Sequence, residues 1–279
     1  MTIPFNTDLS GKVAVVTGGS GVLGSVLSEA LAEAGAKVAV LARTQSKIDR
    51  VVESIKSKGH EAIGYSVDVL NKDDLKRVRE DLKEQFGTCD ILINGAGGND
   101  PKATTSHDYF TEDDGEQSFF DLDQNAVGDL FDMNFLGSFL PTQVFGQDMV
   151  NAEGATIINV SSMNAFTPLT RIPAYSGAKA AVSNFTQWLA VYFSKVGVRV
   201  NAIAPGFFLT DQNRNLLYKE DGSLSERAEK ILSQTPEDRF GEPEELVGTL
   251  MWLVNQQASG FVNGIIVPVD GGFSAYSGV

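Results

Sequence analysis

The chain of 279 residues contains a single cysteine, Cys89, and only two histidines, His60 and His107. One cysteine cannot form an internal disulfide, and isolated histidines do not supply the clustered ligands of common zinc sites. No G-x-S-x-G sequence occurs, so the usual signature of a serine hydrolase is missing. Disulfide scaffolds and multi-cysteine metal sites are therefore excluded, and we expect no bound metal.

Positive charge is also scarce, because 22 Lys and Arg face 36 Asp and Glu for a net charge of −14. Such an excess of negative charge repels nucleic-acid backbones and anionic membranes. No apolar run reaches the roughly 18 residues that a membrane span needs. The first twelve residues lack the basic and apolar segments of a secretory signal. We expect a cytoplasmic protein without nucleic-acid or membrane partners.

Short apolar runs alternate with one-faced helical patterns along the whole chain. This alternation predicts an α/β fold with a doubly wound parallel sheet of the Rossmann type. Without a linker or an internal repeat, residues 1–279 are expected to form a single domain. Two irregular segments, near 98–122 and 207–242, each follow a predicted strand. Open α/β sheets bind ligands at such positions, so we expect both insertions to border the ligand crevice.

Glycine, in contrast, is abundant, with 28 residues, and several follow the first predicted strand in the sequence Thr17-Gly-Gly-Ser-Gly-Val-Leu-Gly24. Glycines at 18, 21 and 24 allow a tight turn and a close approach of the backbone to a pyrophosphate. The helix that follows presents its N-terminus to that negative charge. The segment therefore predicts a dinucleotide-binding loop.

A second motif, Tyr175-Ser-Gly-Ala-Lys179, opens a predicted helix and places both side chains on one face. A phenol ordinarily ionises near pH 10, and a neighbouring ammonium favours its ionised form. Such a pair can exchange a proton with an alcohol or a carbonyl. Ser162 ends a predicted strand on the crevice side and can hydrogen-bond a substrate oxygen. On its own, Tyr-x-x-x-Lys is also common on solvated helices.

Together these motifs resemble the short-chain dehydrogenase/reductase family, and the resemblance runs from about Leu9 to Phe273. It implies that Tyr175 is the general acid/base, that Lys179 lowers its pKa and holds the nicotinamide ribose, and that Ser162 orients the substrate. Asn134 resembles the family's fourth catalytic residue, which supports a water relay to Lys179. A buried helix asparagine bonded to backbone is the alternative for Asn134.

The same resemblance implies a set of cofactor-binding residues: Gly18, Ser20, Gly21, Val22, Leu23, Gly24, Arg43, Asp68, Val69, Asn94, Gly95, Ala96, Tyr175, Lys179, Pro205, Gly206, Phe208 and Thr210. Val22 departs from the family pattern, which has a glycine there. The second predicted strand ends at Ala42 without the acidic residue that would bond a free 2′-hydroxyl. Arg43 follows and can pair with a 2′-phosphate, so NADP(H) is favoured. If Arg43 only stacks on adenine, NAD(H) remains usable.

Three further stretches resemble the family branch of D-mannonate oxidoreductase or fructuronate reductase: residues 94–99, 161–170 and 269–279. This implies reduction of a keto group on a sugar acid. A sugar acid needs a cation and several polar partners. The candidate substrate-binding residues are Ser162, Asn164, Arg171, Asn99 and Arg214.

Other functions remain open at this point. The enzyme could act on gluconate in the manner of gluconate 5-dehydrogenase, or on a 3-ketoacyl thioester, because the insertions contain several phenylalanines. A non-catalytic, nucleotide-sensing regulator is the alternative of another class. The helices near 123–150 and 174–195 carry apolar residues on more than one face, including Trp188 and Tyr192. By resemblance to the family's tetramers, we expect a homotetramer, with burial in the core as the alternative.

Overall fold

The computed structural model describes residues 6–112, 115–210 and 214–278. In these residues seven parallel strands form one sheet in the order β3-β2-β1-β4-β5-β6-β7. The strands are β1 (Val13–Thr17), β2 (Lys37–Ala42), β3 (Ala62–Ser66), β4 (Ile91–Asn94), β5 (Thr156–Val160), β6 (Arg199–Pro205) and β7 (Ile266–Val269). The strand order reverses between β1 and β4, and the ligand crevice of such a sheet lies outside the carboxyl ends of those strands.

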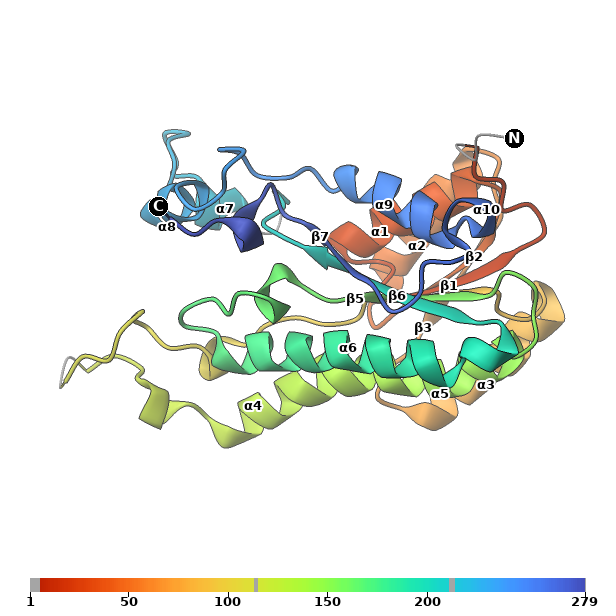
Figure 1. Ribbon diagram of the computed structural model, residues 1–279, viewed down its shortest axis with the longest axis horizontal. Helices are drawn as coiled ribbons and strands as arrows, with labels where there is room; N and C mark the ends of the chain where they lie inside the picture. Colours follow the sequence, from red (N-terminus) through yellow and green to blue (C-terminus); the bar gives the residue numbers. More distant parts are fainter. Residues whose placement is uncertain (1–5, 113–114, 211–213, 279) are drawn as a thin grey trace.

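Helices cover both faces of the sheet (Figure 1). On one face lie α1 (Val22–Glu33), α2 (Gln45–Ser57), α9 (Glu245–Val254) and α10 (Gln256–Ser259). On the other lie α3 (Lys72–Gln85), α4 (Gln124–Phe131), α5 (Gly137–Met149) and α6 (Pro173–Tyr192). The predicted fold class, a doubly wound Rossmann-type sheet, is thus confirmed.

The strands alternate their side chains between two apolar cores. Val13 and Val15 of β1 pack with the α3, α5 and α6 side, whereas Ala14 and Val16 pack with the α1, α2 and α9 side. All four are buried. Burying one such side chain stabilises the fold by roughly 1.5–3 kcal/mol relative to exposure. These two cores fix the carboxyl ends of the strands, from which the candidate site is built.

The single helix expected over 123–150 is instead divided. A π-helical turn, Asp132–Leu136, separates α4 from α5 without ending the helical path. Asn134 lies in this turn and is fully buried. Hydrophobic periodicity could not reveal the turn, because apolar residues continue on both sides of it.

Both irregular segments lie at the same end of the molecule, at the left of Figure 1. The segment after β4 has two short 3-10 turns, Pro101–Ala103 and Phe119–Asp121. The segment after β6 contains α7 (Arg214–Leu217) and α8 (Glu226–Leu232), which share a small apolar core. Among the described residues, no helix has the length and apolar character to cross a membrane.

Candidate functional site

Ser162, Tyr175 and Lys179 meet where β5 ends and α6 begins. Ser162 follows β5, and its Oγ accepts a hydrogen bond from the Asn164 amide at 3.3 Å. Helix α6 begins at Pro173, whose fixed φ suits the first helical position, so Tyr175 lies in the first turn. Lys179 follows one turn later, and its Nζ lies 5.7 Å from the centre of the Tyr175 ring. The structure therefore brings the three predicted catalytic side chains together.

Lys179 is almost completely buried, and its ammonium donates a hydrogen bond to the Val160 carbonyl at 2.8 Å. Burial lowers the pKa of Lys179 to about 8, because a charged amine loses its hydration there. The hydrogen bond ties α6 to the end of β5. Lys179 is thus a buried cation that can release its proton near neutral pH.

The Tyr175 phenol is shifted in the other direction. Burial raises the pKa of Tyr175, and hydrogen bonding with Ser162 opposes that rise. The Lys179 ammonium is hydrogen-bonded to the Val160 carbonyl and lies 5.7 Å from the centre of the Tyr175 ring. The lowered phenol pKa that the sequence led us to expect is therefore not present here, and Ser162 is the group that favours ionisation.

Asn134 is occupied by backbone partners. Its Nδ2 donates to the carbonyls of Gly98 (2.8 Å) and Leu130 (2.9 Å), and its Oδ1 accepts from the Gly98 amide (3.2 Å). Gly97 lies between Asn134 and Lys179: a Cβ at Gly97 would lie 2.6 Å from Asn134 Oδ1 and 3.3 Å from Lys179 Nζ. The π turn thus brings Asn134 to the start of the insertion and near Lys179.

The glycine-rich loop between β1 and α1 is compact enough to receive a pyrophosphate. Gly18 has a left-handed φ of 65°, and a Cβ there would lie 2.6 Å from the Gly95 carbonyl oxygen. A Cβ at Gly24 would lie only 2.2 Å from the Gly18 carbonyl oxygen. Helix α1 follows Gly21 without a side-chain cap and without an acidic residue in its first turn. The uncapped start of this helix therefore fits a dinucleotide phosphate, even with Val22 in place of a glycine.

Ser20, Val22 and Leu23 are half-buried along the same loop, as a cofactor contact requires. At the other side of the crevice, Asp68 is exposed and accepts a hydrogen bond from Leu70 N at 2.9 Å, while Val69 is buried. Their cofactor roles remain predictions.

Arg43 directly follows β2 and is exposed. Its backbone carbonyl accepts a hydrogen bond from Ser66, and no carboxylate among the described residues pairs with its guanidinium. Arg43 is therefore a cation at the edge of the cofactor crevice whose charge is available to a ligand.

The side chain of Asn94 also has a structural role. Its Nδ2 donates to Thr142 Oγ1 (2.9 Å) and Asn159 Oδ1 (2.8 Å), and its side chain is buried between strand and helix. Asn159 in turn donates to Thr186. The Oδ1 of Asn94 has no hydrogen-bond partner among the described residues, and Gly95 and Ala96 after it are half-buried. The cofactor roles of Asn94, Gly95 and Ala96 stay predictions.

The Pro205-Gly206 turn after β6 is held against the end of β7. A Cβ at Gly206 would lie 2.6 Å from Asp270 Cα, so the two chain segments are in backbone contact. Phe208 pairs with Gly241 in an isolated bridge and is buried, and Thr210 is half-buried. These contacts set the path of the backbone that is expected to hold the nicotinamide carboxamide.

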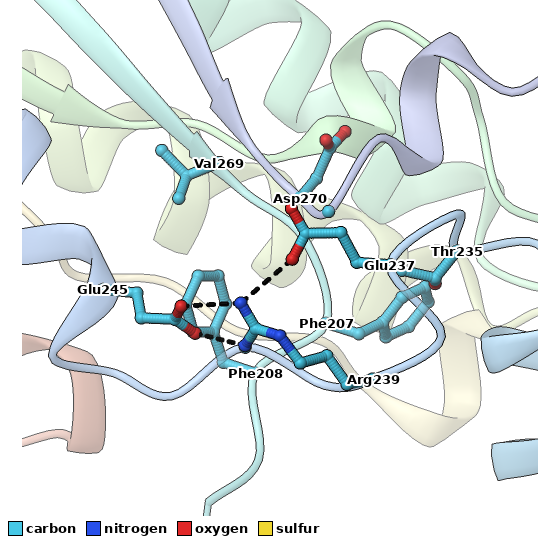
Figure 2. Close-up of a pocket in the computed structure, with 10 residues that line it drawn as sticks. Phe207, Phe208, Thr235, Glu237, Arg239, Glu245, Val269 and Asp270 are labelled. Carbon is cyan, nitrogen blue, oxygen red and sulfur yellow. Dashed lines mark hydrogen bonds and ion pairs between the residues drawn. The ribbon is translucent and has the colours of Figure 1, made fainter.

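A pocket beneath this turn is lined by Phe207, Phe208, Val269 and Asp270, and by a charged trio (Figure 2). In the trio, Arg239 donates to Glu245 at 2.7 Å through both terminal nitrogens and to Glu237 at 2.9 Å. The pocket lining includes none of Ser162, Tyr175 and Lys179. The guanidinium of Arg239 is paired with both carboxylates, and the trio keeps a net negative charge. Because the predicted catalytic residues do not line it, we interpret this pocket as support for the turn rather than as the reaction site.

The candidate substrate residues differ in how far they are already engaged. Arg171 Nε donates to Asp108 at 2.7 Å, and Arg214 lies over the Tyr218 ring at 5.8 Å. Asn99 Nδ2 donates to Thr104 Oγ1 at 3.1 Å. Asn164 is 4% exposed, and its Oδ1 is buried without a hydrogen-bond partner. An unpaired buried acceptor is costly, so Asn164 is the candidate that most needs a donor from a ligand.

Sequence reasoning missed Asp108. Its carboxylate pairs with Lys230 and Arg171, and these hydrogen bonds hold the pKa of Asp108 well below its usual range. The partners lie 63 and 122 residues away in sequence. No local pattern could have identified an acidic residue with such distant partners. Among the described residues, no group of three or more His, Cys, Asp or Glu could hold a metal ion.

Comparison with known proteins places the chain in a family. Residues 12–221 match the family model described as short chain dehydrogenase. An uncharacterized oxidoreductase of Haemophilus influenzae is 55% identical over 281 residues, which cover 100% of this chain and 99% of that protein. A 3-oxoacyl-[acyl-carrier-protein] reductase of Synechocystis is 34% identical over 267 residues, covering 95% and 98%.

The solved structures include a Haemophilus influenzae protein with bound NAD, for which a D-mannonate oxidoreductase activity is proposed. It is 54% identical, covers 100% of both chains and superposes with a TM-score of 0.96. The matches to oxidoreductases confirm an enzyme and leave the regulator without support. On this basis the chain is an NAD(P)-dependent oxidoreductase that belongs to the short-chain dehydrogenase/reductase family.

Proposed function

We propose that the enzyme interconverts a keto group and a secondary alcohol on a sugar acid, with fructuronate and mannonate as the substrate pair. The observation that carries this proposal is the meeting of Ser162, Tyr175 and Lys179 at the end of β5. The proposed activity of the 54% identical Haemophilus structure supports the choice of substrate.

In the proposed reaction, Tyr175 holds the proton that the substrate oxygen gains on reduction. The hydroxyl of Ser162 donates a hydrogen bond to that oxygen and keeps it within reach of the phenol. The nicotinamide cofactor supplies or accepts the hydride when bound. Hydrogen bonding with Ser162 favours the ionised phenol that the oxidation direction needs.

Lys179 and Asn134 are proposed to support that proton transfer. A lysine with a pKa of about 8 can pass a proton near neutral pH, which suits a relay to Tyr175. Asn134 holds the Gly98 backbone beside it, and this supports the proposed place of a water relay to Lys179. Lys179 is also proposed to hold the nicotinamide ribose.

The proposed substrate-binding residues are Ser162, Asn164, Arg171, Asn99 and Arg214. The unpaired Oδ1 of Asn164 can accept a hydrogen bond from a substrate hydroxyl, and a sugar acid carries several. Arg171 or Arg214 supplies the cation for the carboxylate. In a chain of net charge −14, an anionic substrate depends on such local cations.

NADP(H) is the proposed preferred cofactor, because Arg43 follows β2 where an acidic residue would select NAD(H). The NAD bound to the Haemophilus structure supports use of NAD(H) as well. Both cofactors therefore belong in every assay.

A homotetramer in the cytoplasm is the proposed state of the enzyme. Trp188 and Tyr192 on α6 stack at 4.8 Å and are 56% and 65% exposed. A contiguous exposed aromatic surface favours burial against another copy of the chain. Cys89 is a free, buried thiol, the state that a reducing compartment maintains. Light scattering should give four copies, and Trp188→Ala with Tyr192→Ala should reduce that number.

The decisive experiment is a panel of hexuronates, ketogluconates and a 3-ketoacyl thioester, assayed with NADH and NADPH. We expect fructuronate to be reduced with a kcat/KM far above that of the ketogluconates. Equal or greater activity on the thioester would overturn the proposal and favour the function of the 34% identical Synechocystis relative.

Tyr175→Phe tests the mechanism on whichever substrate is turned over. Loss of the phenol should lower kcat by at least about 10³-fold, the upper range for a general acid/base. The matched control is Tyr65→Phe in β3, which removes only a hydrogen bond to Asp81 and should leave kcat unchanged. Full turnover by Tyr175→Phe would contradict the assigned role.

A further inference from the structure

One carboxylate, that of Asp108, joins three separate segments of the chain. It accepts hydrogen bonds from Arg171 Nε at 2.7 Å and from Thr170 Oγ1 at 3.1 Å, and it forms an ion pair with Lys230 of α8. The Asp108 side chain is 16% exposed, so its charge is partly withdrawn from water. Networks of this kind hold geometry better than single exposed ion pairs.

The three segments follow three neighbouring strands. Asp108 comes after β4, Thr170 and Arg171 come after β5, and Lys230 comes after β6. In the sheet, β5 lies between β4 and β6. A link from the segment after β4 to the segment after β6 therefore crosses the carboxyl end of β5, from which Ser162 emerges. The Asp108 contacts thus join segments that leave the same edge of the sheet as Ser162 does.

The contacts of Asp108 with Thr170, Arg171 and Lys230 form what we call the Asp108 junction. Neighbouring contacts hold this junction to α6. The Thr105 amide donates to the Arg171 carbonyl at 2.8 Å, beside the Asp108 contact. Ala103 is fully buried against Ala174 and Ala178 of α6, next to Tyr175. The insertion is therefore packed on the helix that carries the reaction.

Arg171 itself is held in an uncommon conformation. Its φ of 71° lies in the left-handed region, which is unfavourable for a residue with a long side chain. Such a backbone persists only where its surroundings fix it. Only Nε of its guanidinium is bonded among the described residues, which leaves both terminal nitrogens for a ligand. Those two nitrogens match a carboxylate in bidentate geometry.

We propose that Asp108 is a positioning residue that fixes Arg171, with Lys230 beside it, as the recognition site for the substrate carboxylate. This rests on the proposed function, in which the substrate is a sugar acid. Two cations around one carboxylate leave a net positive charge at the junction. In a strongly acidic chain, that charge selects anionic over neutral substrates.

The first test is the kinetics of Asp108→Asn with the sugar acid of highest activity. We expect KM for the sugar acid to rise at least about tenfold, with kcat within threefold and KM for the cofactor within twofold. Asp108→Glu should recover much of the loss, because it keeps the charge. Arg171→Lys should also raise KM for the sugar acid, since it keeps the charge but loses the paired nitrogens.

Glu112→Gln is the matched control, because it removes one negative charge from the same insertion. Glu112 is exposed and has no ion pair among the described residues. Its KM for the sugar acid should stay within twofold of the wild-type value. An equal rise in KM for Glu112→Gln and Asp108→Asn would overturn the specific role of Asp108.

A second measurement separates this proposal from the proposed function. Hydrogen exchange of the Thr105 amide, which bonds to Arg171, requires no substrate. Asp108→Asn should accelerate that exchange at least about tenfold, whereas Glu112→Gln should not. If no sugar acid is turned over by the wild type but exchange responds, the proposed function fails and the positioning role stands. Unchanged exchange, or equal losses in kcat and in both KM values, would overturn the positioning role.

Discussion

On the proposed cofactor side of the crevice, backbone atoms contact backbone atoms: Gly18 approaches Gly95, and Gly24 approaches Gly18, with no room for a side chain between them. On the substrate side, side chains meet across long sequence distances, as when Asp108 contacts Arg171 and Lys230. The first kind of contact involves backbone atoms and depends on glycine at a few fixed positions, even where the two residues are far apart in sequence, as Gly18 and Gly95 are. The second depends on three loops arriving at one place. A fold can therefore keep its cofactor loop while its substrate loops change.

The largest expected effect is the loss of cofactor affinity when one methyl group is added at Gly24. In Gly24→Ala, the new Cβ would meet the Gly18 carbonyl oxygen, and the loop would have to shift. We expect the Kd of the cofactor to rise about 30- to 100-fold, on the order of 2–3 kcal/mol. Isothermal titration with NADPH and NADH measures this.

Gly248→Ala in α9 is the matched control, because nothing lies within 4 Å of its added Cβ. It should leave cofactor affinity unchanged and raise the free energy of unfolding by up to about 1 kcal/mol, through helix propensity. Equal affinities of Gly24→Ala and the wild type would show that the close approach is not required for binding.

Lys179 lies where the two sides meet, and its burial should appear in the pH dependence of stability. Its pKa is lowered from 10.5 to about 8 in the folded chain, so the unfolded chain binds the extra proton between these values. The free energy of unfolding must then rise with pH across that window. The contribution over the full window is about 3 kcal/mol.

Lys179→Met removes the titratable amine and therefore its contribution to the pH dependence. The free energy of unfolding is measured in urea for both proteins from pH 7.5 to 10.5. Across this range, that of the wild type should rise by about 3 kcal/mol relative to that of Lys179→Met. Parallel curves for the two proteins would contradict a lowered pKa for Lys179.

Substitution of Arg43 tests whether the proposed cofactor site recognises the charge of the 2′-phosphate. In Arg43→Ala, kcat/KM for NADPH should fall about tenfold, the loss of one charge-assisted contact, while that for NADH stays within twofold. Arg50→Ala on the exposed side of α2 should change neither. Equal losses with both cofactors would instead indicate stacking on adenine.

The smallest expected effect is that of salt on KM for the sugar acid. At 1 M ionic strength the screening length is about 3 Å, so the partly exposed cations Arg171 and Lys230 attract a carboxylate less. KM for the sugar acid should rise about two- to threefold between 0.05 and 1 M NaCl, with a smaller rise in Asp108→Asn. An equal rise in KM for the wild type and for Asp108→Asn would show that the Asp108 junction does not attract the substrate.

The sequence was sufficient for the parts of the molecule that depend on local patterns. The alternation of apolar strands and one-faced helices predicted the sheet, and Tyr175 and Lys179 on one helical face predicted the reactive pair. It was not sufficient for Asn94, whose side chain belongs to a buried amide network with Asn159 and Thr142. Nor could spacing show that burial, more than Lys179, governs the Tyr175 phenol.

The π turn at Asp132–Leu136 makes the position of Asn134 depend on the number of residues in this segment. Relative to a regular helix it accommodates one surplus residue, and such turns are less favourable than the α-helix around them. Deleting one residue there would let α4 and α5 join as an ordinary helix. Asn134 would then rotate by roughly 100° relative to α5, away from Gly98 and the lysine, because each residue turns the helix by that angle. The reactive geometry therefore depends on the number of residues between Phe131 and Gly137, as well as on their identity.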